Sequence, residues 1–192
     1  MDALLMCGGR GTRLGGGEKP LREVAGATLL DRVRDALAAS RVRTVYAVTS
    51  PAAPETAASA AAPVIETPGD GYVRDLRTAL SDDRVEQPVL TVAADLPLLD
   101  GEALDAVLEA ADGRTLTVAV PAGRVRALGF SVDTTYRTGG IAVRPAGVNV
   151  VGPDPERTWV TRDPRLAANV NRPRDRLAAA WRLAAPDTSL RQ

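Results

Sequence analysis

The sequence predicts an α/β fold in which helices cover a doubly wound, mostly parallel and Rossmann-like sheet within a single domain. Three observations support this prediction. Short apolar runs typical of buried strands alternate with alanine- and leucine-rich segments of helical periodicity. The chain of 192 residues is long enough to bury one core. The first apolar run leads into the glycine-rich stretch "CGGRGTRLGGGEKPL", and open parallel sheets bind ligands where their strands end.

The first half of the chain follows this alternation closely. Residues 3–6 are predicted as the first strand because four apolar residues follow one another there. A helix over residues 29–37 comes next, since its apolar residues recur with helical spacing and Thr28 can cap its first turn. The remaining strands of this half are predicted at 42–49, 64–65 and 89–93, and the remaining helices at 54–61 and 73–80.

The second half is less regular. A helix over residues 102–111 precedes a strand at 116–120, and a further strand is predicted at 147–152, extended by Trp159 and Val160. Residues 121–145 have no clear pattern and are interpreted as a flap beside the site. A helix at 173–185 closes the fold, with Trp181 expected to pack on the body of the protein. The domain is therefore predicted to span residues 1–185, followed by a frayed tail at 186–192.

The composition excludes several classes of function. A net charge of zero argues against a nucleic-acid-binding protein. The absence of histidine excludes mechanisms and metal sites that depend on imidazole, and the single cysteine, Cys7, excludes an internal disulfide and a multi-cysteine zinc site. No apolar run approaches the roughly 18–20 residues of a membrane span, and no signal peptide is recognisable. The default expectation is a cytoplasmic protein whose metal, if it binds one, is a hard cation held by oxygen.

The basic residues are distributed unevenly by type. Lys19 is the single lysine among 24 basic residues, and it lies inside the glycine-rich stretch. An ammonium group on a thin stem enters spaces that a planar guanidinium cannot enter. The position therefore favours a functional role for Lys19, with accident as the alternative.

The glycine-rich stretch has the chemistry of a cradle for a triphosphate. Three of its glycines allow the backbone N–H groups to approach phosphate oxygens closely, and these are Gly8, Gly9 and Gly11. Arg10, Arg13 and Lys19 add positive charge. The stretch is not a Walker A loop, which needs Gly-Lys-Ser/Thr at the start of a helix. It is not a G-x-G-x-x-G fingerprint either, because Leu14 replaces the third glycine. The alternative is an ordinary flexible turn.

Asp95 lies two residues after the strand predicted at 89–93. Its carboxylate would lie at the same sheet edge as the glycine-rich stretch, where Mg²⁺ could bind through one or two protein oxygens together with phosphates and water. A turn residue before Pro97 is the alternative for Asp95 taken alone. Together with the cradle, the metal role is favoured.

These motifs resemble a known family. "GGRGTRLGGGEKPL" is similar to the signature loop of nucleotidyltransferases with the nucleoside-diphosphate-sugar transferase fold, which include molybdenum-cofactor guanylyltransferases and sugar-nucleotide pyrophosphorylases. "TPGDGYVRDL", "PAGVNVV" and "NVNRPRDRLAAAWRLA" follow in the order seen in the archaeal GTP:adenosylcobinamide-phosphate guanylyltransferases of cobalamin synthesis, which the chain most resembles. Arg10 is a departure, because a lysine is usual at that position of such loops.

The resemblance implies that GTP and adenosylcobinamide phosphate react to give adenosylcobinamide-GDP and pyrophosphate. It implies that Lys19 contacts the α-phosphate and Arg13 the β- and γ-phosphates. Backbone N–H groups from Gly8 to Thr12 would hold the remaining oxygens. Asp95 would bind Mg²⁺ together with Asn171, for which capping of the last helix is an equal alternative.

Other residues are assigned to the two substrates. Guanine needs acceptors for N1–H and its 2-amino group. The candidates are backbone carbonyls near Met6 to Gly8 and the carboxylate of Asp75, with Gly71 allowing close approach. Asp75 could equally be a solvated helix residue paired with an arginine. Gly147 and Asn149 are predicted to face the acceptor substrate, and a tight turn at the end of a strand is their alternative.

Two other functions remain open at this point. One is a nucleotidyltransferase of the same family that acts on molybdopterin or on a sugar phosphate, because it would share the phosphate cradle. The other is a nucleotide-binding module without catalytic activity, against which the single lysine argues. The sequence leaves both a monomer and a homodimer open, and it contains no segment that would anchor the chain in a membrane.

Overall fold

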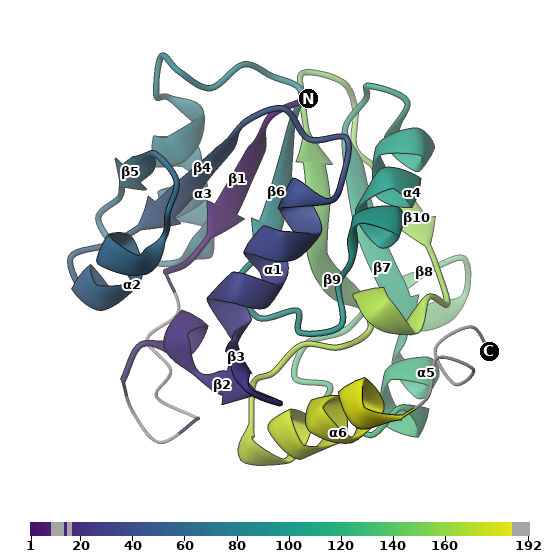
Figure 1. Ribbon diagram of the computed structural model, residues 1–192. Coiled ribbons are helices and arrows are strands. Elements are labelled where there is room, and N and C mark those ends of the chain that lie inside the picture. Colours follow the sequence, from purple (N-terminus) through teal and green to yellow (C-terminus); the bar gives the residue numbers. More distant parts are fainter. Residues whose placement is uncertain (9–13, 15–16, 186–192) are drawn as a thin grey trace.

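A mixed sheet of eight strands forms the centre of the protein, in the order β10-β7-β9-β6-β1-β4-β5 with β8 paired to β9 (Figure 1). The computed structural model describes residues 1–8, 14 and 17–185, so the predicted tail at 186–192 lies outside the described residues. The strands are β1 (Ala3–Met6), β4 (Val45–Thr49), β5 (Val64–Glu66), β6 (Val89–Ala93), β7 (Leu116–Pro121), β8 (Tyr136–Thr138), β9 (Ile141–Val151) and β10 (Arg157–Val160).

Most pairings within this sheet are parallel. β1 pairs in parallel with β4 and β6, β4 with β5, and β10 with β7, whereas β9 runs antiparallel to β6, β7 and β8. The predicted single-domain α/β fold with a mostly parallel sheet is therefore confirmed. A separate ribbon of β2 (Glu23–Val24) and β3 (Ala27–Thr28), which the sequence did not indicate, precedes the first long helix.

Helices cover both faces of the sheet (Figure 1). Along the chain they are the 3₁₀ helix η2 (Lys19–Leu21), α1 (Leu29–Ala38), α2 (Pro54–Ser59), α3 (Tyr72–Leu80), α4 (Gly101–Ala111), α5 (Ala122–Ala127), the 3₁₀ helix η3 (Pro164–Leu166) and α6 (Pro173–Ala184). α1 and α4 pack on one face and α3 on the other. Thr28 caps α1 as predicted, because its hydroxyl accepts a hydrogen bond from the N–H of Asp31 at 3.0 Å. Within the described ranges, every helix is too short or too polar to span a lipid bilayer.

The alternation of side chains along β6 divides the core into two parts. Leu90 and Val92 join the larger cluster beneath α1 and α4, whereas Val89 joins the smaller cluster beneath α3. The two covering helices α1 and α4 approach closely at Gly101, where a Cβ atom would lie 2.4 Å from the carbonyl oxygen of Ala39. The apolar strands are thus buried on both faces, as expected for a parallel sheet.

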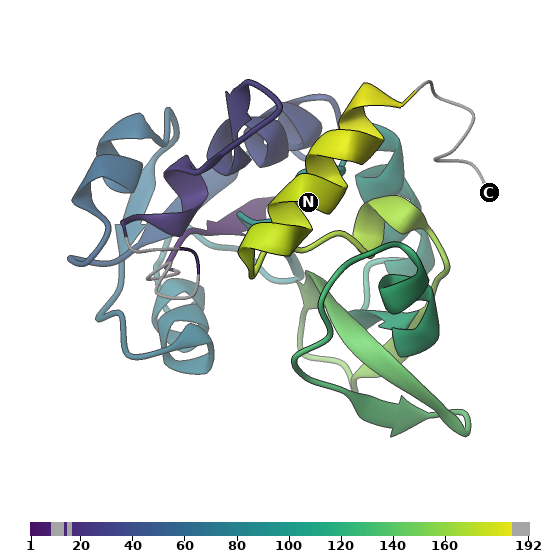
Figure 2. The same ribbon diagram turned by 90° about the horizontal axis from the view of Figure 1, so that it is seen from below.

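The region that the sequence left unassigned, residues 121–145, contains α5, β8 and the beginning of β9. β8 and β9 form a hairpin that projects from the body of the protein (Figure 2). Its turn consists of Gly139 and Gly140, with φ angles of 54° and 80°, as the hairpin turn with two left-handed residues requires. The predicted strand at 147–152 was too short, because β9 already begins at Ile141.

α6 lies across the edge of the sheet where the parallel strands end (Figures 1 and 2). The prediction that Trp181 packs on the body was wrong, since 66% of this residue is exposed. The helix packs instead through small residues, with Ala179 fully buried and Ala178 and Ala180 against the core. A row of alanines brings the helix close to the body, so the indole lies on the outer side.

Candidate active site

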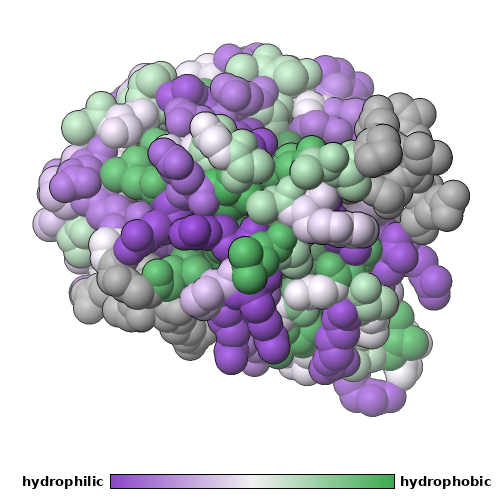
Figure 3. Space-filling model, turned by 60° about the horizontal axis from the view of Figure 1, so that its bottom comes forward, coloured by the Kyte–Doolittle hydropathy of each residue, from purple (hydrophilic) through white to green (hydrophobic). Residues whose placement is uncertain are grey.

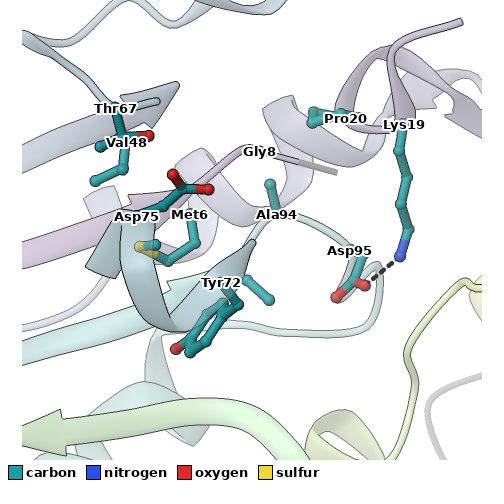
Figure 4. A pocket seen from close by; sticks show the side chains of 11 residues that line it. Met6, Gly8, Lys19, Pro20, Val48, Thr67, Tyr72, Asp75, Ala94 and Asp95 are labelled. Carbon is teal, nitrogen blue, oxygen red and sulfur yellow. Dashed lines mark hydrogen bonds and ion pairs between the residues drawn. The ribbon is translucent and has the colours of Figure 1, made fainter. Parts of the chain in front are cut away.

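Three loops that follow strands meet at one edge of the sheet, as predicted. They follow β1 at Cys7 and Gly8, β5 at Thr67, and β6 at Ala94 and Asp95. Between them lies a cavity of about 260 Å³ (Figure 4). Its lining consists of Met6, Gly8, Lys19, Pro20, Val48, Thr67, Tyr72, Asp75, Ala93, Ala94 and Asp95. Seen from this edge, no single apolar surface dominates the described residues, because hydrophilic and hydrophobic side chains are interspersed (Figure 3).

Lys19 lies at one end of this cavity and holds two oxygens from distant parts of the chain. Its Nζ donates to Oδ2 of Asp95 at 2.5 Å and to Oδ1 of Asn171 at 2.7 Å. The side chains of Lys19 and Asp95 are each 15% exposed, so the pair is shielded from water but reachable from the cavity. Three residues predicted for the site are therefore brought together (Figure 4 shows the pair of Lys19 and Asp95).

Asp95 is also held by the side-chain amide of Asn169, a residue that the sequence reasoning missed. Nδ2 of Asn169 donates to Oδ1 of Asp95 at 2.8 Å, and the N–H of Val170 donates to the main-chain oxygen of Asp95 at 3.0 Å. Both carboxylate oxygens of Asp95 are thus engaged, one by an ammonium and one by an amide. The signal was the spacing of Asn169 and Asn171, because alternate residues of an extended segment point to the same side.

The two alternatives for Asn171 are now resolved in part. The last helix has Arg172 as its N-cap, so the interpretation of Asn171 as the cap was wrong. Its side chain points instead to Lys19, and its role as a metal ligand remains a prediction.

Asp75 lies on α3 at the other end of the cavity and is only 5% exposed. Its Oδ1 accepts a hydrogen bond from the N–H of Gly69 at 2.8 Å. Its Oδ2 faces Gly8, where a Cβ atom would lie 3.6 Å away. The alternative of a solvated helix residue was therefore wrong. Gly71 is the N-cap of α3 with a φ of 107°, a conformation that favours glycine.

The residues assigned to the acceptor lie on β9. Gly147 has a φ of 83°, and a Cβ atom there would lie 3.3 Å from both Cβ of Ala93 and Nδ2 of Asn169. Asn149 pairs with Thr91 of β6 and Thr117 of β7 in the sheet ladder. Gly147 thus borders the cluster around Asp95, whereas Asn149 lies further along the strand.

Most of the residues predicted to contact the phosphates belong to the glycine-rich stretch. Gly9, Arg10, Gly11, Thr12 and Arg13 lie outside the described residues. Gly8 and Lys19 frame this stretch, and both line the cavity.

Burial shifts the pKa of two further groups near the site. Burial raises the pKa of the Cys7 thiol to about 12, so this cysteine is a small buried residue rather than a nucleophile. Burial lowers the pKa of Arg144 on β9, and the charges of Asp95 and Asp175 act in the opposite direction. Arg144 is thus a buried cation in the field of the carboxylates around the site.

The carboxylate of Glu18 fixes the chain just before Lys19. It accepts hydrogen bonds from the N–H groups of Glu55 at 2.9 Å and Thr56 at 2.5 Å, which lie in the first turn of α2. Burial is the largest single influence on the pKa of Glu18 and raises it, but the hydrogen bonds from Thr56 and Glu55 together outweigh burial and lower the pKa below its usual value. Glu18 therefore ties the lysine to a neighbouring helix.

We expect Glu18→Gln to lower the free energy of unfolding at pH 7 by about 1 kcal/mol, because an amide can satisfy only one of these two N–H groups. The lowered pKa means that the contribution of Glu18 is full above its unfolded pKa and is lost as the pH falls through the folded one. The difference between the wild type and Glu18→Gln should thus disappear in acid. Urea unfolding at several pH values measures it.

Glu109→Gln is the matched control for this experiment, since Glu109 is an exposed glutamate on α4 beside Met1, at the far end of the sheet. Its unfolding should match that of the wild type at every pH. A Glu18→Gln protein with unchanged stability at pH 7 would contradict the role given to Glu18.

Oxygen atoms suited to a hard cation are present at the Lys19 cluster. Oδ2 of Asp95 and Oδ1 of Asn171 both lie within hydrogen-bond distance of the same ammonium, so they already converge on one positive charge. Among the described residues, no three carboxylates, thiols or imidazoles lie close enough to hold a metal without further ligands. This donor set fits a cation such as Mg²⁺, which takes one or two protein oxygens and completes its shell with phosphates and water.

The fold and the site together define a nucleotidyltransferase-like α/β protein. The chain belongs to the family of the MobA-like NTP transferase domain, which matches residues 3–142. An adenosylcobinamide-phosphate guanylyltransferase of Methanocaldococcus jannaschii is 32% identical over 169 residues, which is 80% of this chain and 81% of that protein. A molybdenum cofactor guanylyltransferase of Rhodopseudomonas palustris is 40% identical over 79 residues, or 41% of this chain and 37% of that protein.

Solved structures support the fold. A CMP:2-keto-3-deoxy-manno-octonic acid synthetase complexed with CTP superposes with a TM-score of 0.65 at 15% identity, over 96% of this chain and 99% of that one. A hypothetical transferase from Thermus thermophilus superposes with a TM-score of 0.59 at 24% identity. That alignment covers 79% of this chain and 64% of the other.

Proposed function

We propose that this chain transfers GMP from GTP to adenosylcobinamide phosphate, giving adenosylcobinamide-GDP and pyrophosphate. The observation that carries the proposal is the ammonium of Lys19, held between Asp95 and Asn171 at one end of a cavity at the carboxyl edge of the sheet. The choice of acceptor rests on the similarity to the guanylyltransferase of Methanocaldococcus jannaschii, which covers four fifths of both chains.

In the proposed reaction, the protein mainly positions the two substrates and stabilises negative charge. An oxygen of the acceptor phosphate attacks the α-phosphorus of GTP, the bond to the β-phosphate breaks, and pyrophosphate leaves. The attacking phosphate is already ionised, so a chain without histidine can carry out the step without a general base. Lys19 would stabilise the negative charge that develops on the α-phosphate oxygens.

Asp95 and Asn171 would hold a Mg²⁺ ion in the proposed reaction. When bound, the ion would neutralise charge on the phosphate oxygens and orient them. Asn169 would keep the carboxylate of Asp95 in place through the hydrogen bond to Oδ1. Gly147 borders this cluster and, with Asn149, is assigned to the acceptor side.

Nucleotide selectivity tests the base-binding end of the cavity. The buried carboxylate of Asp75 would accept hydrogen bonds from N1–H and the 2-amino group of guanine, which adenine and the pyrimidines do not offer in this arrangement. We expect GTP to bind with a micromolar dissociation constant, equivalent to about 8 kcal/mol, and more tightly than ATP, UTP or CTP. Asp75→Asn should weaken GTP binding by about 10- to 100-fold, because an amide places a donor where an acceptor is needed.

Isothermal titration calorimetry with the four nucleotides measures this selectivity. Asp82→Asn is a suitable control, since Asp82 lies beyond the other end of α3, where it binds Arg84. It should bind GTP as the wild type does. Equal affinities for the four nucleotides, or an Asp75→Asn protein that binds GTP normally, would contradict the assignment of Asp75.

The acceptor is tested by incubating the protein with GTP and Mg²⁺ and measuring pyrophosphate release. Adenosylcobinamide phosphate, molybdopterin and a sugar phosphate are supplied in separate reactions. We expect release with adenosylcobinamide phosphate. Release with molybdopterin alone would favour the second candidate, a molybdenum-cofactor guanylyltransferase, which the similarity to the Rhodopseudomonas palustris enzyme over 79 residues supports. GTP binding without release in any reaction would indicate a catalytically inactive nucleotide-binding module.

A further inference from the structure

Asp175 is a buried carboxylate to which the proposed reaction gives no role. It lies in the first turn of α6 and is 0% exposed. Four donors surround it. Oδ1 accepts from the N–H of Ser131 at 2.8 Å, and Oδ2 accepts from the hydroxyl of Ser131 at 2.5 Å and from the N–H groups of Asn171 at 3.0 Å and Arg172 at 2.8 Å. Such a set of donors compensates a charge that is removed from water.

Capping of α6 explains only part of this arrangement. A side chain at the third helical position that binds the N–H of the N-cap residue needs only the contact with Arg172. The contacts with Asn171 and Ser131 reach outside the helix. Ser131 follows α5, 44 residues before Asp175, so the carboxylate joins two separate segments to the helix.

The segment before α6 connects this carboxylate to the Lys19 cluster. The N–H of Asn171 is bound to Asp175, while the side-chain oxygen of the same residue accepts from Nζ of Lys19 at 2.7 Å. Two residues earlier, Asn169 donates to Asp95. Further back, the guanidinium of Arg144, a residue that is only 5% exposed, donates to the carbonyl oxygen of Ala167 at 2.9 Å. Buried charged groups thus hold this segment on both sides of the two asparagines.

We propose that Asp175 is a positioning residue, which fixes the backbone of Asn171 so that its amide oxygen keeps the Lys19 ammonium beside Asp95. The effect on catalysis rests on the proposed function, but the effect on Lys19 does not. Asp175 acts through Asn171, and Ser131 supports it by binding the same carboxylate oxygen. Asp175→Asn keeps the shape of the side chain but directs an amide NH₂ group toward N–H donors, so Asn171 loses its support.

The single lysine of the chain allows a direct test. Protein grown with ¹⁵N-labelled lysine gives one side-chain Nζ signal, which reports the hydrogen bonds of Lys19 without nucleotide or acceptor. We expect Asn171→Ala to shift this signal and to speed its proton exchange. Asp175→Asn should change it in the same direction, and Ser131→Ala should do so to a smaller extent.

Asp31→Asn is the matched control, because Asp31 occupies the same third position of α1 and also binds its N-cap residue. It should leave the Lys19 signal unchanged. If Asp175→Asn does not fold, Ser131→Ala removes only a hydroxyl and carries the test by itself. An unchanged Lys19 signal in the folded Asp175→Asn protein, or in Ser131→Ala when that variant stands alone, would overturn the proposal.

Turnover provides a second readout with adenosylcobinamide phosphate as acceptor. Asp175→Asn is expected to lower kcat about tenfold, or about 1.4 kcal/mol, with little change in the KM for GTP. In an Asn171→Ala background the same substitution should change kcat less than twofold, because the residue through which it acts is gone. Equal losses in both backgrounds would indicate a merely structural role and contradict the proposal. A wild type without turnover would contradict the proposed function and leave the Lys19 signal as the test of Asp175.

Discussion

Replacing Lys19 with glutamine is expected to lower kcat for pyrophosphate release by about 10³-fold, or about 4 kcal/mol. The side chain of Lys19 is 15% exposed, and its ammonium lies between Asp95 and Asn171, where it can reach an α-phosphate bound in the cavity. Glutamine retains a donor but not the charge, and the negative charge on the α-phosphate rises in the transition state. GTP affinity should change much less, because ground-state binding uses many contacts.

Lys19→Arg separates charge from shape. The other basic residues of the chain are all arginine, so this variant tests whether position 19 requires a lysine. A guanidinium is bulkier than an ammonium and its N–H groups are fixed in one plane, so it fits poorly at the position of Nζ, which lies 2.5 and 2.7 Å from two oxygens. We expect Lys19→Arg to recover less than a tenth of the wild-type kcat. A Lys19→Gln protein with kcat within tenfold of the wild type would contradict a role for the ammonium in catalysis.

Lys19→Gln should weaken catalysis but strengthen metal binding. In the structure, the ammonium of Lys19 donates to both oxygens that are proposed to hold Mg²⁺. A divalent cation therefore competes with Lys19 for them. Lys19→Gln should bind Mn²⁺ more tightly than the wild type in a titration followed by electron paramagnetic resonance. Equal or weaker Mn²⁺ binding would show that the metal uses other ligands.

The sequence predicted the parts of the fold that have a regular pattern. β1 and β6 each contain four consecutive buried residues, and α1 has both an apolar face and a capping threonine, so their positions were predicted closely. β9 was predicted too short, because Pro145 and Gly147 interrupt its pattern, and the register shifts at this place. β2 and β3 have two residues each, which is too few for any periodicity.

The sequence predicted those residues of the site whose positions follow from where the strands end. Lys19, Asp95 and Asp75 line one cavity because parallel strands end at the same edge of a sheet. Asn169 was missed because its spacing from Asn171 indicates only that the two side chains point to the same side, and not that Asp95, 74 positions earlier, is its partner. Trp181 was placed wrongly because a large apolar residue is usually buried, whereas here the alanines of α6 form the contact. Sequence patterns therefore identified the edge and the charges, but not the amides that orient them.

Asp95→Asn is expected to lower kcat by about 10²- to 10³-fold while GTP binding changes less than about threefold. The carboxylate makes two contacts that depend on its charge and shape, with Nζ of Lys19 at 2.5 Å and with Nδ2 of Asn169 at 2.8 Å. An asparagine can keep only one of them, because its NH₂ group must face either the ammonium or the other amide. The ammonium would then be left without its counter-charge, and the oxygen assigned to the metal would become a weaker ligand.

Loss of stability could mimic this result, and Asp2→Asn controls for it. Asp2 is 6% exposed and pairs with the more exposed Arg43 at the opposite end of β1, so its replacement also removes a buried carboxylate from an ion pair. Both variants should unfold at lower urea concentration, but Asp2→Asn should keep the wild-type kcat. Calorimetry with GTP and steady-state pyrophosphate release separate the two effects. If Asp95→Asn lost GTP binding and turnover in parallel, Asp95 would act in nucleotide binding rather than in the transfer step, because a residue that acts mainly in the transition state lowers kcat and leaves ground-state affinity intact.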